Sequence, residues 1–207
     1  MTSPTSLHDW FGDIDIYLFD QLLKGRFSPG MAVLDAGCGG GRNIVYFLRS
    51  GYEVFAVDQS REAVDRVRSL AAALAPGLPQ ENFRAEAVEH MSFADARFDF
   101  VLSSAVLHFA RDEEHWHEMV REMWRVLRPG GLFLARLASS IGIESKITHI
   151  DGRRYHLPDG SDRFLVDEEM LMKTTDSLGG QLVEPIKTVV VQGMRSMTTW
   201  CLRRSRT

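Results

Sequence analysis

The segment "MAVLDAGCGGGRN", from Met31 to Asn43, is where this 207-residue chain most clearly signals chemistry. An apolar run of four residues ends at Asp35, and glycines follow at positions 37, 39, 40 and 41. Missing side chains let a ligand lie against the backbone, and the N-terminus of the helix that follows offers free N–H groups. A plain tight turn is the alternative, but such a turn rarely needs four glycines in five positions. The segment therefore predicts a ligand site.

The residues around the glycines restrict the kind of ligand. A dinucleotide fingerprint would need a third glycine at position 42, where the chain has Arg42, and the Gly-Lys-Ser/Thr of a phosphate-binding loop is absent. Asp35 would repel a pyrophosphate and attract a cation. A second apolar segment, "YEVFAVD", ends at Asp58, whose carboxylate suits the two hydroxyls of a ribose. We therefore expect a ligand with positive charge at one end and a ribose at the other.

The elements that position these residues alternate along the chain. Continuous apolar strands separated by helices predict an α/β fold with a doubly wound, mostly parallel sheet covered on both faces. Two late strands joined by a short turn must form an antiparallel hairpin. The predicted helices cover residues 13–24, 42–51, 60–75, 112–128 and 166–178. The predicted strands lie within residues 31–37, 52–58, 82–87, 98–102, 132–138, 181–193 and 197–204.

Length and composition indicate one domain over residues 1–207. The net charge of −4 argues against binding nucleic acid by bulk electrostatics. The chain has neither a secretory signal nor an apolar run near the roughly 20 residues that span a bilayer, so we expect a cytoplasmic protein without membrane association. Cys38 and Cys201 suit a reducing compartment, and Cys38 is interpreted as a small buried filler. Because no carboxylate–histidine cluster has ligand spacing, no metal is predicted.

Four motifs together carry a family resemblance. "VLDAGCGGGRN", "VFAVDQS", "RFDFVLSSAVLHF" and "EMWRVLRPGGLFLA" occur in the order and spacing of class I S-adenosylmethionine-dependent methyltransferases, and the match extends from Ala32 to Ala138. The resemblance implies a Rossmann-like sheet of seven strands with one antiparallel strand. It also implies S-adenosyl-L-methionine as cofactor and methyl transfer as the activity.

The resemblance assigns the cofactor site residue by residue. Asp35 and the backbone around Gly37 and Gly39 would hold the methionine end of S-adenosylmethionine. Asp58 would bind the ribose hydroxyls, and Gln59 would lie beside the adenine.

The segment after the third strand would recognise the adenine edge. The family usually has Gly-Asp-Ala there, whereas this chain has Ala85-Glu86-Ala87. We therefore assign Glu86, together with the backbone amide of Ala87 or Val88. The following "EHMSF" allows an alignment shifted by one residue.

Two further positions are assigned to the methionine end. Ser103 and Ser104 end the fourth strand, and at least one of them, with Ser103 as our choice, should line the methionine moiety or the path of the methyl group. Arg42 is a candidate partner for the cofactor carboxylate, with a surface arginine on the first helical turn as the alternative.

Methyl transfer from a sulfonium is an in-line displacement in which a general base is optional. His108 is the candidate catalytic residue, because it follows the fourth strand on the side where the acceptor should approach. A histidine at a helix end or in the core is the alternative. His115 and His117 are interpreted as surface residues of the helix after Asp112.

An N-terminal addition to the sheet is expected to shape the acceptor pocket. Residues 1–28 are predicted to form a helical lid that brings Trp10, Phe11 and Tyr17 near the cofactor. A helix that packs on the core is the alternative.

A second addition follows the fifth strand. Residues 139–165 are predicted to form a substrate-side loop in which Arg154 and Tyr155 suit a small, anionic acceptor. A solvated loop is the alternative.

Three functions are compatible with these patterns. The first is methyl transfer to a small-molecule acceptor by a monomer or homodimer. The second is methylation of RNA or protein, and the third is a module that binds S-adenosylmethionine without catalysing methyl transfer.

Overall fold

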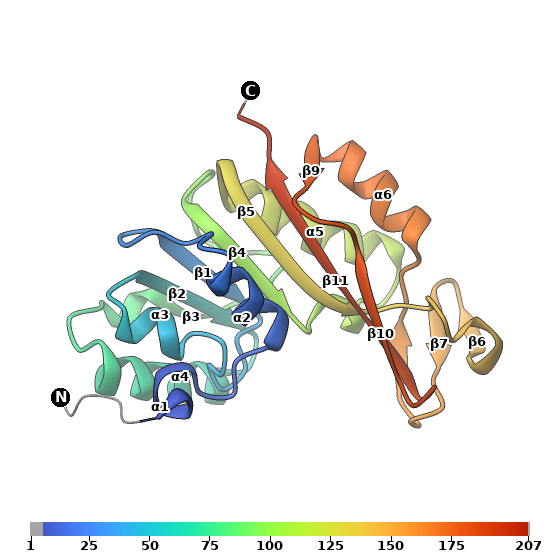
Figure 1. Ribbon diagram of the computed structural model, residues 1–207, viewed down its shortest axis with the longest axis horizontal. Coiled ribbons are helices and arrows are strands. Elements are labelled where there is room, and N and C mark those ends of the chain that lie inside the picture. Colours follow the sequence, from blue (N-terminus) through green and yellow to red (C-terminus); the bar gives the residue numbers. More distant parts are fainter. Residues whose placement is uncertain (1–5, 207) are drawn as a thin grey trace.

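Strand β1 (Ala32–Ala36) lies near the centre of the main sheet, and all five of its residues are buried. The computed structural model describes residues 6–206. The other strands of this sheet are β2 (Glu53–Asp58), β3 (Phe83–Ala85), β4 (Phe98–Ser104), β5 (Leu127–Ala138), β9 (Gly180–Leu182), β10 (Lys187–Val191) and β11 (Arg195–Arg204). Their order is β3-β2-β1-β4-β5-β11-β10, with β9 paired to β11 (Figure 1).

The pairing directions confirm the predicted sheet. The strands from β3 to β5 are all parallel, whereas β11 runs antiparallel to β5 and to β10. Seven strands follow one continuous path, as the family resemblance implied. β9 is an additional short strand, whose residues 180–182 overlap the predicted hairpin only in part.

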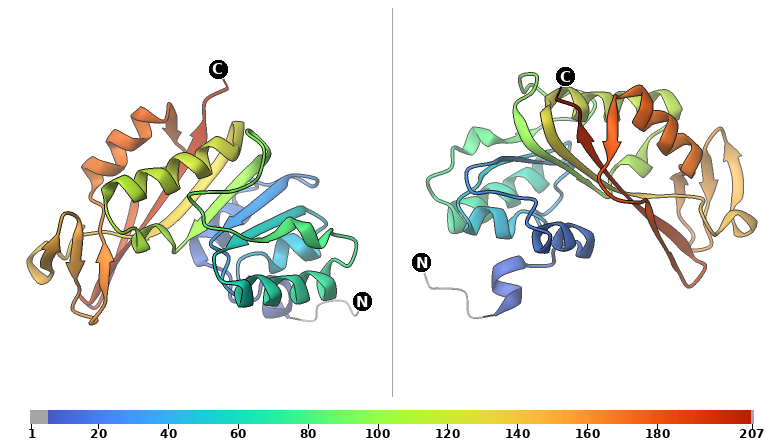
Figure 2. Two further views of the ribbon diagram at one scale, coloured as in Figure 1. Left: turned by 180° about the vertical axis from the view of Figure 1, so that it is seen from behind. Right: turned by 45° about the horizontal axis from the view of Figure 1, so that its top comes forward.

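Helices cover both faces of the sheet, which places its core in two layers (Figures 1 and 2). The helices are α1 (Leu7–Phe11), α2 (Ile16–Leu23), α3 (Val45–Arg49), α4 (Arg61–Leu74), α5 (Glu113–Val126) and α6 (Glu168–Ser177). Val33 of β1 packs in a cluster with residues of α2, α3 and α4, and its neighbour Leu34 packs in a cluster with residues of α5 and α6. This alternation is expected for a strand buried on both faces.

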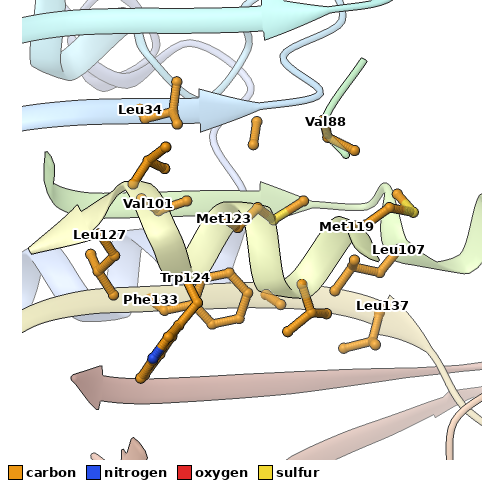
Figure 3. Close-up of a cluster of buried hydrophobic side chains, with 14 of the residues drawn as sticks. Leu34, Val88, Val101, Leu107, Met119, Met123, Trp124, Leu127, Phe133 and Leu137 are labelled. Carbon is orange, nitrogen blue, oxygen red and sulfur yellow. The ribbon is translucent and has the colours of Figure 1, made fainter. Parts of the chain in front are cut away.

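The sequence of helix α5 explains where the helix begins and which side of it packs on the sheet. The Asp112 side chain accepts a hydrogen bond from the His115 backbone N–H at 2.8 Å and caps the first turn. The apolar side of the helix is buried, and Figure 3 shows Met119 and Met123 packed over Leu34, Val101 and Phe133 of the sheet. Ser60 caps α4 in the same way, so both predicted helix starts are confirmed.

The insert at residues 139–165 differs from its prediction. It is not an open loop but contains a small antiparallel sheet of β6 (Thr148–Asp151), β7 (Arg154–His156) and β8 (Asp162–Phe164). Leu157 and Leu165 anchor this sheet on Ala138 at the end of β5. Strands of three or four residues are too short to show the alternation of apolar and polar residues that identifies a strand, which explains why a loop was predicted here.

The N-terminal segment packs on the main domain. Helix α2 is shorter than predicted, because Asp15 caps it by accepting from the Tyr17 backbone N–H. The ring of Phe11 lies 4.9 Å from that of Phe19 and 5.2 Å from that of Tyr46 on α3. These contacts join α1, α2 and α3. Residues 1–5 of the predicted lid lie outside the described residues.

Residues 6–206 contain neither a helix suited to a membrane nor a cluster suited to a metal ion. None of the helices in this range is long and apolar enough to cross a membrane. The same range contains no group of three or more His, Cys, Asp or Glu side chains arranged to hold a metal ion. Cys38 and Cys201 are both buried and unpaired, which agrees with the interpretation of Cys38 as a filler.

Gly37 is constrained by both its backbone and its neighbours. Its φ is +82°, and an added Cβ would lie 2.2 Å from Cγ2 and 3.1 Å from Cβ of Val106. Gly51 has a similar φ of +74° but open space at the Cβ position. Alanine substitutions at the two positions therefore distinguish the cost of backbone strain, which both share, from the cost of overpacking, which arises only at Gly37.

Replacing Gly37 with alanine should destabilise the protein more than replacing Gly51 does. Gly51→Ala should cost about 1–2 kcal/mol of unfolding free energy through backbone strain. Gly37→Ala should cost roughly 1–3 kcal/mol more, because rotation of Val106 does not clear its Cβ. Urea denaturation followed by circular dichroism measures both values. Equal losses of unfolding free energy in the two variants would contradict the close approach between Gly37, after β1, and Val106, after β4.

Candidate active site

Two cavities adjoin beyond the carboxyl ends of the parallel strands, where ligands bind in sheets of this kind. The first, of about 460 Å³, is called the glycine-loop cavity and is lined by residues that include Gly37, Gly39, Asp58, Val88 and Val106. The second, of about 330 Å³, is called the arginine cavity and is lined by residues that include Arg42, Arg136, Arg163 and Arg195. Ala105 lines both, so the cavities meet just after β4.

The glycine loop uses its backbone amides within the protein. The N–H groups of Gly37 and Cys38 both donate to the Val57 carbonyl, at 2.8 and 3.0 Å. The Gly39 N–H donates to Oδ2 of Asp58 at 2.9 Å. These three amides belong to the turn and not to the N-terminus of α3 (Val45–Arg49), where the sequence predicted free N–H groups. The loop therefore presents a close-packed backbone surface with few free donors.

Asp58 ends β2 at the rim of the glycine-loop cavity. Its Oδ2 accepts from Gly39, and its Oδ1 accepts from the Ser60 N–H at 2.9 Å. Each carboxylate oxygen has a second acceptor position, so two further donors can bind. The two backbone bonds hold the carboxylate in one orientation at the rim of the cavity.

Asp35 is a buried carboxylate without a partner. Its side chain is fully buried, and neither oxygen has a hydrogen-bond partner among residues 6–206. Burial raises its pKa from 3.8 to about 7, Arg42 opposes this shift, and Asp58 adds to it. An orphaned carboxylate just behind Gly37 is the feature that a ligand with a positive group would compensate. Asp35 lines neither cavity, so its charge would act on a ligand through the glycine loop and without direct contact in this conformation.

The segment after β3 forms another part of the wall of the glycine-loop cavity. Ala87, Val88 and Glu89 line the glycine-loop cavity, as does Gln59 after β2. Glu86 does not belong to that lining, and its Oε2 accepts from the Ser92 N–H at 2.8 Å. Glu89 lines the cavity without having been assigned from the sequence, where a one-residue shift in the alignment of "EHMSF" does not reach it from Glu86.

His115 is not a surface residue, which corrects the sequence interpretation. It is 7% exposed and lines the glycine-loop cavity. Its Nε2 lies 3.0 Å from Oε1 of Glu89, and its Nδ1 accepts from the Arg111 N–H at 3.1 Å. The helical pattern alone could not show that the segment after β3 covers this side of α5. His117 stays partly exposed.

Arg42 and the serines after β4 lie toward the other cavity. Arg42 lines the arginine cavity, where its Nη2 is 3.7 Å from Oδ2 of Asp15 and 3.4 Å from Oγ of Ser104. Ser103 is fully buried, and its hydroxyl has no partner within the described residues. Neither Arg42 nor Ser103 lines the glycine-loop cavity.

The arginine cavity is formed by segments that are far apart in the sequence. Its arginines come from the turn before α3, from β5, from β8 and from the start of β11. Two carboxylates, Asp15 and Asp159, share the cavity wall. Oδ2 of Asp15 is 3.4 Å from Nε of Arg136, while Oδ1 of Asp159 accepts from the Ser161 N–H and hydroxyl.

His108 lines the arginine cavity and is 8% exposed. Its Nδ1 accepts from the Ala138 N–H at 3.4 Å, which requires the proton of the neutral ring on Nε2. Burial lowers its pKa from 6.5 to about 4, and the nearby Arg163 adds to the shift. At neutral pH the ring is therefore uncharged and offers a hydrogen-bond donor rather than a base.

The remaining predicted acceptor residues are dispersed. Tyr17 lies beneath Arg136, whose Cζ is 4.5 Å from the ring centroid. Trp10 is 38% exposed, and Phe11 packs between helices as described above. Arg154 and Tyr155 lie on β7, and neither lines the arginine cavity. The insert instead contributes Arg163, which the sequence did not single out.

Residues 34–135 match a family model described as a methyltransferase domain. The matched range contains the glycine loop, β2, β4, α5 and most of β5. It therefore includes all the residues named above that line the glycine-loop cavity.

Three curated relatives are similar over part of their length. An uncharacterized methyltransferase of Synechocystis is 34% identical over 106 residues, which are 51% of this chain and 46% of the relative. Malonyl-[acyl-carrier protein] O-methyltransferase of Pseudescherichia vulneris is 31% identical over 158 residues, 75% and 57% of the two chains. tRNA 5-carboxymethoxyuridine methyltransferase of Escherichia coli is 27% identical over 124 residues, 60% and 46%. The chain thus spans about half the length of the curated relatives it matches.

A solved structure confirms the fold. The 1,6-didemethyltoxoflavin-N1-methyltransferase of Burkholderia thailandensis aligns with a TM-score of 0.70 and 23% identity, over 95% of this chain and 80% of that chain. That structure contains 1,6-didemethyltoxoflavin and S-adenosylhomocysteine. The likeness shows the Rossmann-like arrangement that the sequence predicted.

The raised pKa of Asp35 predicts a pH-dependent stability in the ligand-free protein. Between about pH 4 and pH 7 the unfolded chain releases this proton while the folded protein keeps it, so the free energy of unfolding falls as the pH rises. Asp35→Asn removes the effect and should become more stable than the parent above pH 7, by up to about 4 kcal/mol at about 1.4 kcal/mol per pKa unit. Thermal denaturation from pH 4.5 to pH 8 measures the difference.

A matched control is Asp65→Asn on the exposed face of α4, where the side chain is 61% exposed. It should leave the pH profile of the parent unchanged. Parallel pH profiles for Asp35→Asn and the parent would refute the assignment of a raised pKa to Asp35.

Proposed function

We propose that this chain, because it carries a class I S-adenosylmethionine-dependent methyltransferase domain, transfers a methyl group from S-adenosylmethionine to a small-molecule acceptor. One observation carries the proposal: two separate cavities meet at Ala105, beyond the carboxyl ends of β1 and β4. A donor in one cavity and an acceptor in the other would face each other there. The arginine cavity, of about 330 Å³, has the size of a small molecule.

The glycine-loop cavity suits S-adenosylmethionine at both ends. In this proposal Asp58 accepts hydrogen bonds from the two ribose hydroxyls, for which its backbone contacts orient it. Gly37 and Gly39 let the methionine part approach the backbone, and the carboxylate of Asp35 compensates the positive charge of the amino group. Arg42 remains a partner proposed for the cofactor carboxylate, and Ser103 a residue proposed beside the methyl path.

The residue proposed to bind the adenine edge differs from the one assigned from the sequence. Glu89 lines the cavity, and one of its oxygens is held by His115 at 3.0 Å, which leaves the other for the exocyclic amino group of adenine. Gln59 and the backbone of Ala87 and Val88 complete this wall. We therefore propose Glu89 in the role that the sequence assigned to Glu86.

Bound S-adenosylmethionine supplies an activated methyl group, and the chain contributes alignment and exclusion of water. His108 is proposed to act from the acceptor side. Because its Nδ1 accepts from Ala138, its Nε2–H is the group available to donate to the acceptor. This role orients the acceptor and does not require the histidine to remove a proton.

Methylation of RNA or of a carrier protein is the second candidate. The relatives named above include enzymes whose names specify acyl-carrier protein and tRNA as acceptors. Both names also contain a carboxyl-bearing group, malonyl and carboxymethoxyuridine. A net charge of −4 and an acceptor cavity of about 330 Å³ favour a small molecule over a nucleic acid. Cytoplasmic localisation and a monomeric or dimeric state stay predictions of the sequence.

Calorimetry and turnover test the function together. S-adenosylhomocysteine should bind with at least tenfold higher affinity than NAD, and the methyl group of labelled S-adenosylmethionine should appear in a member of a panel of small acids, amines and phenols. Tight binding without turnover on small molecules, bulk tRNA or carrier protein would favour a non-catalytic binding module. Equal affinity for NAD would overturn the proposed cofactor.

Asp58→Ala should weaken the binding of S-adenosylhomocysteine by about 1–3 kcal/mol, because the ribose hydroxyls lose their acceptor. Glu62→Ala on α4, which lines neither cavity and is 84% exposed, is the control and should bind normally. Because Asp58 also bonds the backbone, thermal denaturation of each variant must accompany the calorimetry. Unchanged affinity in a folded Asp58→Ala protein would contradict the ribose assignment.

A matched pair of glutamates tests the adenine assignment. Glu89→Gln should weaken S-adenosylhomocysteine binding by about 1–2 kcal/mol, because the amide nitrogen would face the amino group of adenine. Glu86→Gln should have little effect, since that carboxylate bonds Ser92. Calorimetry on both variants decides between them. A loss only in Glu86→Gln would restore the assignment made from the sequence.

A further inference from the structure

The arginine cavity contains more positive than negative charge. Arg42, Arg136, Arg163 and Arg195 line it together with two carboxylates, Asp15 and Asp159. The ring of His108 is neutral at physiological pH, because its pKa is about 4. The side chains on the wall therefore leave two positive charges uncompensated.

The four arginines are not equally neutralised. Asp15 lies within 3.7 Å of Arg42 and within 3.4 Å of Arg136, so a single carboxylate serves both. Arg163 and Arg195 form no ion pair with any residue between 6 and 206. Like charges gathered in one cavity repel each other, and this repulsion is relieved when an anion binds among them.

Arg136 is more buried than Arg42 in this cavity. Its side chain is 17% exposed and rests on the ring of Tyr17, and its Nη1 is buried without a hydrogen-bond partner in the described part of the chain. A guanidinium held by an aromatic ring and one carboxylate is oriented in advance, with donors left over. This is the arrangement expected where an anion completes the hydrogen bonding.

The other cations are positioned around the same space. The guanidinium of Arg163 lies 4.9 Å from the ring centroid of Phe109, a residue that lines the neighbouring glycine-loop cavity. Arg163 therefore lies near the boundary between the two cavities. Arg195, at the start of β11, is exposed and forms no direct ion pair with the described residues. The charge of Asp159 acts on both Arg163 and Arg195, so here too a single carboxylate serves two arginines.

We infer that the arginine cavity binds the methyl acceptor through an anionic group, a carboxylate or a phosphate, held by Arg136, Arg163 and Arg195. This inference rests on the proposed function and adds the chemical class of the acceptor. His108 donates its Nε2–H to the same acceptor, and Ala105 marks the side from which the methyl group arrives.

The test uses the complete chain saturated with S-adenosylhomocysteine and titrated by calorimetry with small probes. Succinate represents the carboxylate source, inorganic phosphate represents the phosphate source, and succinamide is the neutral counterpart of succinate. At least one of the anions should bind, and succinamide should bind at least tenfold more weakly than that anion. The anion that binds identifies the source.

Single substitutions locate the binding. Arg163→Gln and Arg195→Gln should each weaken the bound anion about tenfold or more, because each loses a charge-assisted hydrogen bond. Arg121→Gln on the exposed face of α5, which lines neither cavity, should leave anion binding unchanged. Affinity for S-adenosylhomocysteine should be the same in all three variants.

The outcomes separate this inference from the proposed function. If S-adenosylhomocysteine binds but neither anion does, or if Arg121→Gln lowers anion affinity as much as Arg195→Gln, the acceptor class is refuted and methyl transfer remains. If S-adenosylhomocysteine does not bind, the proposed function itself is refuted, and with it this inference.

Discussion

The close approach of two loops at neighbouring strand ends determines where both cavities lie. β1 pairs with β2 on one side and β4 on the other, and the chain leaves β1 and β4 toward opposite faces of the sheet. Between them Gly37 touches the side chain of Val106, a contact that no Cβ at position 37 would permit. The crevice that opens beside this contact is the switch point of the sheet, where ligands of doubly wound folds bind.

The central part of this arrangement could be predicted from the sequence. Continuous apolar runs that end at Asp35 and Asp58 identified two adjacent parallel strands, and strand ends of a parallel sheet share one edge. Asp58 accordingly lines the glycine-loop cavity with the glycines. These predictions succeeded because they depend on local patterns and on one topological rule.

Features that depend on contacts between distant segments could not be predicted in the same way. His115 is buried because Glu89, 26 residues earlier, folds over its helix. The insert sheet depends on pairing between strands of three or four residues, which carry no period. Sequence reasoning chose Arg154 and Tyr155 from the insert for their residue types, whereas the residue of the small sheet that lines the cavity is Arg163 on β8, the pairing partner of Tyr155.

Arg136 lies just beyond the end of the range that the methyltransferase family model matches. The range matched by the methyltransferase family model ends at residue 135, and Arg136, Arg163 and Arg195 all follow it. In the proposed function, the donor pocket is encoded before this boundary and most of the cationic acceptor wall after it. Under this proposal, substitutions in the insert sheet and the final hairpin alter acceptor choice while leaving the methyl-donor machinery intact, so the two specificities can diverge independently.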